Sequence, residues 1–226
     1  MIVSGLEFLL SPLLFAMDLV FGALRSVTGS AGWSIALLSV FTALLTQPLR
    51  TWAQVIEKRV SLRKLAVDKQ VASRTAGLKG EPKFRATECI YETHGYHPIQ
   101  SIALGAPLFV MLPFLLSALI LFSSNPSLKD VPFFFISDLS QPDGLLIGLN
   151  LLPIVMTGIT LVDSRIRFET DASTFRRFIF IALIMFVLVY SFASGIVLYW
   201  TVSNLVAMLT FIVRRSNSAM NSPDVS

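Results

Sequence analysis

The sequence predicts an all-α polytopic membrane protein: a five-transmembrane-helix core with an N-terminal interfacial amphipathic helix and a cytoplasmic helical hairpin. The 226 residues are 54% hydrophobic and only 14% charged, whereas a soluble domain of this length carries roughly a quarter charged residues. Apolar stretches long enough for membrane helices recur along the chain, at 33–49, 99–123, 144–162, 178–192 and 195–213. We therefore expect one compact core over residues 31–215.

Residues 1–30 are predicted to form an amphipathic helix at the outer leaflet. On a helix over 3–26 the polar residues share one narrow stripe, which consists of Glu7, Ser11, Asp18, Gly22 and Arg25. Such a stripe is typical of a helix that lies along the membrane surface. A tilted span whose stripe faces the bundle is the alternative. We do not expect a signal peptide, because no basic residue precedes the apolar run and no cleavage site follows it.

The basic residues predict the orientation of the spans. Residues 50–85 hold ten of the 18 Lys and Arg residues, and residues 165–177 hold four. Arg214 and Arg215 follow the last span. The positive-inside rule then places the 50–98 and 163–177 loops and the tail in the cytoplasm, with the N-terminus outside. The short tail, 216–226, is expected to be disordered, and the membrane to be a prokaryotic plasma (inner) membrane.

The 50–98 loop is predicted to be a helical hairpin. Residues 51–76 contain no Gly or Pro, residues 77–80 break the helical pattern, and Pro82 suits the first turn of a second helix. Its basic residues are Arg59, Arg63, Lys64, Lys69, Lys79, Lys83 and Arg85. The hairpin has two interpretations: a solvated loop at the lipid headgroups that sets topology, or a landing surface for a nascent chain, a ribosome or a targeting factor.

Polar residues recur within the predicted spans and indicate a shallow hydrophilic groove that opens toward the cytoplasm. On the first span Ser39, Thr42 and Thr46 share a face, and on the third Asn150 and Thr157 do. The last span carries Tyr199, Trp200, Thr201, Ser203, Asn204 and Thr210. A single Ser or Thr in a membrane helix often bonds only to its own backbone. An asparagine at membrane depth is costlier, so Asn150 and Asn204 favour the groove.

We expect no metal, cofactor, disulfide or enzymatic site. His94 and His97 lie near Cys89 and Glu92, but Pro98 follows at once and the spacing is typical of a helix end. Cys89 is the one cysteine. Asp138 and Asp143 flank a proline, as turn-forming residues do, and no Gly-rich phosphate loop is present.

Five blocks of the chain carry a family resemblance at matching spacing. They are Gly32–Ser39 through Gln47-Pro48-Leu49, His94-Gly-Tyr-His-Pro98, Gly105–Pro113, Asp138-Leu-Ser-Gln-Pro-Asp143 with Leu152–Met156, and Ser194-Gly-Ile-Val-Leu-Tyr-Trp-Thr-Val-Ser-Asn-Leu205. Together they resemble the YidC/Oxa family of membrane protein insertases over residues 6–215.

The resemblance implies a groove that receives the hydrophilic parts of client membrane proteins. The client's hydrophobic segment then leaves along the first and last core spans, without nucleotide hydrolysis. Expected partners are newly made membrane proteins and the lipid bilayer, with a translocon or ribosome as further candidates and no nucleic-acid recognition.

Three departures from the family pattern limit what the resemblance implies, and one of them is the short, almost uncharged tail after Arg215, which argues against strong ribosome binding there. Ala43 stands where family members carry a groove arginine that is thought to attract acidic clients, and Ala193 stands where they carry a proline. Ala43 favours the alternative of a specialised paralogue that acts as an assembly scaffold. A transporter is disfavoured, because no charged residue lies in the middle of a predicted span.

Overall fold

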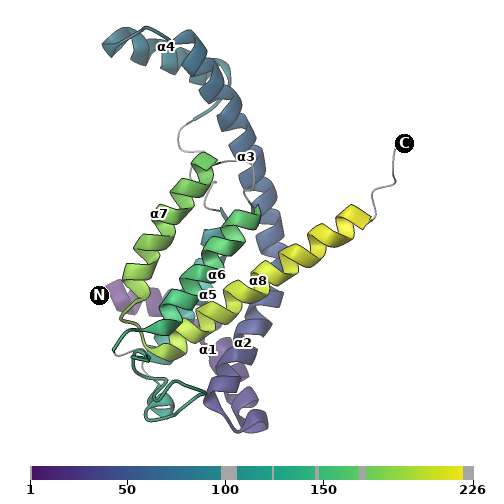
Figure 1. Cartoon of the computed structure of the whole chain (residues 1–226), viewed down its shortest axis with the longest axis vertical. Coiled ribbons are helices and arrows are strands. Elements are labelled where there is room, and N and C mark those ends of the chain that lie inside the picture. Colours follow the sequence, from purple (N-terminus) through teal and green to yellow (C-terminus); the bar gives the residue numbers. More distant parts are fainter. Residues whose placement is uncertain (1, 98–105, 124, 146–147, 168–171, 221–226) are drawn as a thin grey trace. The chain divides into compact units, whose positions relative to one another are not determined.

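The structure is a computed structural model of the chain, and it describes residues 2–97, 106–123, 125–145, 148–167 and 172–220. In these ranges the regular secondary structure is helical, and an isolated bridge pairs Phe133 with Ile136 (Figure 1). The all-α class predicted from composition is confirmed. The chain divides into two compact units, residues 46–112 and the remainder.

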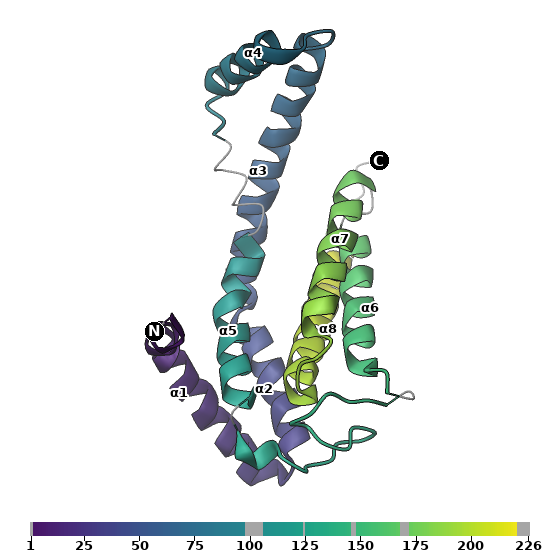
Figure 2. The ribbon, with the colours of Figure 1, turned by 90° about the vertical axis from the view of Figure 1, so that its left-hand side faces the viewer.

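The larger unit is built around helix α8 (Ser194–Met220). This helix packs against α2 (Ala31–Leu45) and against α6 (Leu151–Arg167) (Figures 1 and 2). Helix α1 (Ile2–Thr28) lies on α2, and α7 (Ala172–Val189) lies on α6. Helix α5 (Ala106–Ser123) belongs to this unit from Pro113 onward, and a short 3₁₀ helix, η2 (Pro126–Leu128), follows it.

The core of the larger unit lies where these helices and the 125–150 loop meet. Ile35 and Leu38 of α2, Phe122 of α5 and Val197 of α8 are almost completely buried there. From α1, Met17 and Phe21 join the same core, while Ser11, Asp18 and Gly22 are exposed. The exposed side of α1 also carries Phe8, Phe15 and Leu19.

The smaller unit contains the predicted hairpin, α3 (Gln47–Arg74) and α4 (Gly80–Thr93). Pro48 occupies the first turn of α3, where a missing backbone N–H costs nothing. Val67, Ile90 and Tyr96 form a small apolar cluster between the two helices. Gly77 and Gly80 both adopt positive φ angles, +88° and +62°, which explains the break between them.

Several helix boundaries differ from the expected ones: α2 ends at Leu45 and not at 49, and α7 begins at Ala172 and not at 178. Helix α6 begins at Leu151 and not at 144, because Asp143 accepts a hydrogen bond from Leu151 N and Asn150 accepts one from Gly144 N. It continues to Arg167, past the expected end at 162, because an Asp163–Arg167 ion pair supports its last turn. Helix α8 continues to Met220, past 215, since no Gly or Pro interrupts it there.

The number of membrane spans stays a prediction. By length and composition, two helical segments in the described ranges can cross a membrane, Phe8–Thr28 and Ser194–Asn217. A third is possible if α2 and α3 form one span that is broken at Thr46. Phe109–Ser123 and Ile179–Val189 are apolar but shorter. Residues 99–105 of the second predicted span, 168–171 of the second loop and 221–226 of the tail lie outside the described residues.

Candidate functional site

A hydrogen bond between side chains joins helices α2 and α8. The hydroxyl oxygen of Thr42 lies 2.9 Å from that of Tyr199. The Thr42 hydroxyl also lies 2.9 Å from the Leu38 carbonyl oxygen, to which its single proton is donated. Tyr199 is then the donor in the bond between the helices, and Thr42 the acceptor.

The predicted groove residues of α2 and α8 lie on the contacting faces, but most are buried. Ser39, Thr42 and Ala43 on α2, and Tyr199 and Ser203 on α8, are each at most 4% exposed. Trp200 and Asn204 are partly exposed. The structure therefore places polar side chains where α2 and α8 meet, and shields those of α2 from solvent.

The remaining predicted groove residues lie elsewhere. Thr46 belongs to the smaller unit, just before α3. Thr157 on α6 and Thr201 on α8 each donate to the carbonyl four residues before, at 2.8 Å from Pro153 and 2.7 Å from Val197. These two threonines therefore bond back to their own helices, as hydroxyls in membrane helices often do.

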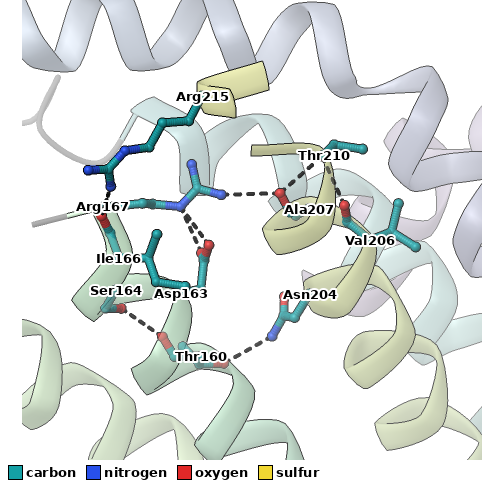
Figure 3. Close-up of polar contacts among 10 residues, drawn as sticks. All are labelled: Thr160, Asp163, Ser164, Ile166, Arg167, Asn204, Val206, Ala207, Thr210 and Arg215. Atoms are coloured by element: carbon teal, nitrogen blue, oxygen red, sulfur yellow. Dashed lines mark hydrogen bonds and ion pairs between the residues drawn. The ribbon is translucent and has the colours of Figure 1, made fainter. Parts of the chain in front are cut away.

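A second set of polar contacts joins α8 to α6 (Figure 3). The side-chain amide of Asn204 donates to the Thr160 hydroxyl oxygen at 3.1 Å. About one turn along α8, the Ala207 carbonyl accepts from Arg167 Nη2 at 3.3 Å. Near the end of α6, the Ile166 carbonyl accepts from Arg215 at 3.3 Å. We call these contacts the α6–α8 seam.

Arg167 makes the most contacts in this seam. Its Nε lies 2.9 Å and 2.8 Å from the two carboxylate oxygens of Asp163, and its guanidinium lies 4.3 Å from the ring centroid of Phe211. The Arg167 and Asp163 side chains are only 17% and 23% exposed. The sequence analysis missed this pair because it ended the span at 162. The four-residue spacing of opposite charges was the signal that could have found it.

Asn150 lies at the junction between the 125–150 loop and α6. Its side-chain oxygen accepts from Gly144 N at 2.9 Å, and its amide donates to the Tyr190 carbonyl at 2.6 Å. Beside it, the Asp143 carboxylate accepts from the first two backbone amides of α6, at 2.6 and 3.0 Å. These contacts favour a structural role for both residues. Asp143 provides the hydrogen-bond acceptor that the first backbone amides of the helix lack.

Asp138 holds the middle of the same loop. Burial raises the pKa of this carboxyl. The hydrogen bonds from the backbone and hydroxyl of Ser140 and from the backbone of Asp130, together with the charge of Lys129, lower the pKa by more than burial raises it. The net effect holds the pKa of Asp138 below its usual value. Asp138 therefore stabilises the turn as a charged acceptor.

The predicted basic residues of the hairpin lie along α3 and α4, except Lys79, which directly precedes α4, and most of them are exposed. Arg85 pairs with Glu81 at 2.6 Å, but both side chains are more than 70% exposed. Such a pair contributes little stability. Across the ranges that the structure describes, no group of three or more His, Cys, Asp or Glu residues could hold a metal ion.

Comparisons with known proteins identify relatives of the chain. A family model described as 60Kd inner membrane protein matches residues 23–220. The chain is 26% identical over 207 residues to "Membrane protein insertase YidC" of Legionella pneumophila (strain Corby), covering 91% of this chain and 35% of that protein. It is 29% identical over 224 residues to the protein of the same name from Chlamydia caviae, covering 89% and 27%.

A solved structure is also similar. It is described as "Active YidC insertase crystal structure with the first transmembrane domain resolved", and it matches 91% of this chain and 46% of its own with a TM-score of 0.59. At 17% identity this likeness is one of fold. The chain spans about a third of the length of the curated Legionella relative.

Proposed function

Because the chain belongs to the 60Kd inner membrane protein family, which is the YidC/Oxa family, we propose that it is a membrane protein insertase and chaperone. In this proposal it receives the hydrophilic parts of newly made membrane proteins and releases their hydrophobic segments into the bilayer. It forms no covalent intermediate and hydrolyses no nucleotide. The relatives from Legionella pneumophila and Chlamydia caviae carry the name of this activity.

One observation carries the proposal: an apolar helix, α8, makes polar contacts on two sides. Tyr199 bonds to α2 and Asn204 bonds to α6. Farther along, the Ala207 carbonyl accepts from Arg167. Moving an unpartnered polar group into hydrocarbon costs several kcal/mol. A row of groups that can exchange hydrogen bonds with a client lowers that cost.

Admission of a client requires α2 and α8 to separate. Ser39 and Thr42 are buried in this structure, so a client reaches them only when the Thr42–Tyr199 bond opens. The client backbone then replaces that bond. Its hydrophobic segment leaves along the outer face of α2, where Leu37 and Phe41 are exposed.

We propose the topology that the basic residues predict: five spans, an N-terminus outside, and a C-terminus and hairpin in the cytoplasm of a prokaryotic plasma membrane. The exposed side of α1 carries the polar residues Ser11 and Asp18 next to the apolar residues Phe15 and Leu19, a mixture that supports its interfacial placement. The basic hairpin would then face the ribosome or translocon that delivers clients.

Site-specific photo-crosslinking tests the proposal. Photo-crosslinkers are placed at Ser39, Ala43 and Asn204, and stalled nascent membrane proteins are then added. A crosslinker at Leu183, an exposed apolar position on α7, is the matched control. We expect client crosslinks at the three positions and few at Leu183. Equal labelling at all four, or none at the first three, would contradict the groove.

The second candidate is an assembly scaffold, and Ala43 favours it. This residue is buried and uncharged, so the helix offers no cation there to an acidic client. Growth of an insertase-deficient strain discriminates the two functions. The chain should restore growth if it inserts clients, whereas a pure scaffold should not.

A further inference from the structure

Residues 133–136 form a tight turn that places a bulky residue in an unfavourable backbone conformation. Phe133 and Ile136 exchange two backbone hydrogen bonds of 2.9 Å, which leaves Phe134 and Phe135 at the tip. Phe134 has a φ of +52°. The first tip position of a two-residue turn with positive φ is one that glycine normally occupies, because a side chain there meets the backbone.

The ring of Trp33, on α2, packs against two aromatic rings of the turn. The Trp33 ring lies 5.6 Å from Phe133 and 5.7 Å from Phe134, with both pairs T-shaped. Gly32 makes this possible, since a Cβ atom at that position would overlap the ring of Phe133.

The unfavourable conformation is not compensated by burial within the chain. The Phe134 side chain is 75% exposed and that of Phe135 is 59% exposed. A strained backbone that presents apolar rings to the outside is typical of a functional site and does not serve the fold alone.

The surroundings of the turn identify what the rings meet. Trp33 begins a stripe of exposed apolar side chains along α2, continued by Leu37, Phe41 and Leu44 at helical spacing. Next to the turn lies a shallow, open apolar pocket, which the turn residues form together with Trp33, Ala36, Leu152, Leu198 and Val202. In a membrane protein, a surface of this kind faces lipid hydrocarbon.

Charged and polar residues flank the tip on the chain. Lys129, Asp130 and Ser137 are exposed, and Asp138 is held as a charged carboxylate. An apolar tip with a polar base suits the boundary between hydrocarbon and headgroups, where aromatic residues concentrate in membrane proteins.

We propose that the 133–136 turn is a lipid anchor. Phe134 and Phe135 insert into the hydrocarbon of the outer leaflet, and an acyl chain occupies the apolar pocket next to them. The choice of leaflet rests on the topology proposed above. The anchor fixes the depth of the ends of α2 and α8 that meet at this loop.

Spin labels on the 226-residue chain measure this insertion. In a Cys89→Ser background, single cysteines replace Phe134, Phe135 or the control Ser137, and each labelled protein is reconstituted into vesicles of phosphatidylcholine and phosphatidylglycerol. We expect labels at 134 and 135 to collide more with oxygen than with a water-soluble nickel chelate, and the label at 137 to show the reverse. Chelate-accessible labels at 134 and 135 would overturn the proposal. Protection from both reagents would overturn it too, because a protein partner would then cover the rings.

A second variant tests why phenylalanine occupies the strained position. Phe134→Gly relieves the backbone, so we expect a Tm in detergent that is equal to or above that of the parent. We also expect the label at 135 to become more accessible to the chelate in vesicles. A lower Tm with unchanged depth would assign the ring to folding and overturn the anchor. Since no client is present, the outcome does not depend on insertase activity.

Discussion

The hydroxyl oxygens of Thr42 and Tyr199 lie 2.9 Å apart across the contact between α2 and α8. Thr42 retains a second bond to the Leu38 carbonyl, so the two partners are not equivalent. Removing the Tyr199 hydroxyl leaves Thr42 bonded to its own helix. Removing the Thr42 hydroxyl takes an acceptor away from a buried phenol.

We therefore predict that Thr42→Val destabilises the chain more than Tyr199→Phe does. The loss should be about 1–2 kcal/mol for Thr42→Val and below about 1 kcal/mol for Tyr199→Phe. Thermal unfolding in detergent measures both, and Thr42→Ser, which keeps the hydroxyl, is the control. Equal losses would show that the hydrogen bond does not run from Tyr199 to Thr42.

Replacing Arg167 by lysine should weaken its contacts with Asp163 and with α8. Arg167 bonds to a carboxylate and to the Ala207 carbonyl at once, and an ammonium lacks the planar fork for both. We expect Arg167→Lys to cost about 1–2 kcal/mol in the free energy of unfolding.

The matched control for this change lies on α4. Arg85 pairs with Glu81 at the same four-residue spacing but in an exposed position, so Arg85→Lys should leave the unfolding transition unchanged. A similar loss in both variants would mean that the α6–α8 seam adds nothing beyond the helix pair itself.

Asn150 is expected to act on stability and not on client binding. Asn150→Ala removes bonds to Gly144 and Tyr190 and should cost about 1–3 kcal/mol. Asn150→Asp keeps the acceptor for Gly144 but sets an oxygen against the Tyr190 carbonyl, so it should be at least as harmful. Client crosslinking from Asn204, normalised to folded protein, should not change. Normal stability with lost crosslinks would place Asn150 in the groove.

Local signals predicted the helices well. The absence of Gly and Pro over 51–76, the break at Gly77–Gly80 and the proline at 82 correspond to α3, the turn and α4. Apolar composition located α8 for the same reason: a membrane helix must satisfy its backbone internally, so its apolar run is long and continuous.

Composition could not predict which polar residues meet. Asn150 and Asn204 look alike in the sequence, yet one holds a loop and the other bonds to α6. The difference depends on where α6 begins, which Asp143 sets through its bonds to Leu151 and Leu152, and on Tyr190, which lies 40 residues from Asn150 in the sequence. Likewise Arg167 was assigned to a loop, because hydropathy ends a span at its first charge even where the helix continues.

Gly195, at the start of α8, is predicted to tolerate replacement by alanine poorly. A Cβ atom there would lie 3.2 Å from the Leu139 carbonyl oxygen and 3.3 Å from Ile35 Cδ1. The loop cannot simply withdraw, since the same carbonyl accepts a 2.9 Å hydrogen bond from Gly195 N. We expect Gly195→Ala to cost about 1–3 kcal/mol.

Gly158 on α6, where a Cβ would meet nothing within 4 Å, is the control: Gly158→Ala should instead stabilise by about 0.5–1 kcal/mol. Thermal unfolding of the two variants side by side measures the difference, and equal shifts would refute the close approach of α8 to the loop.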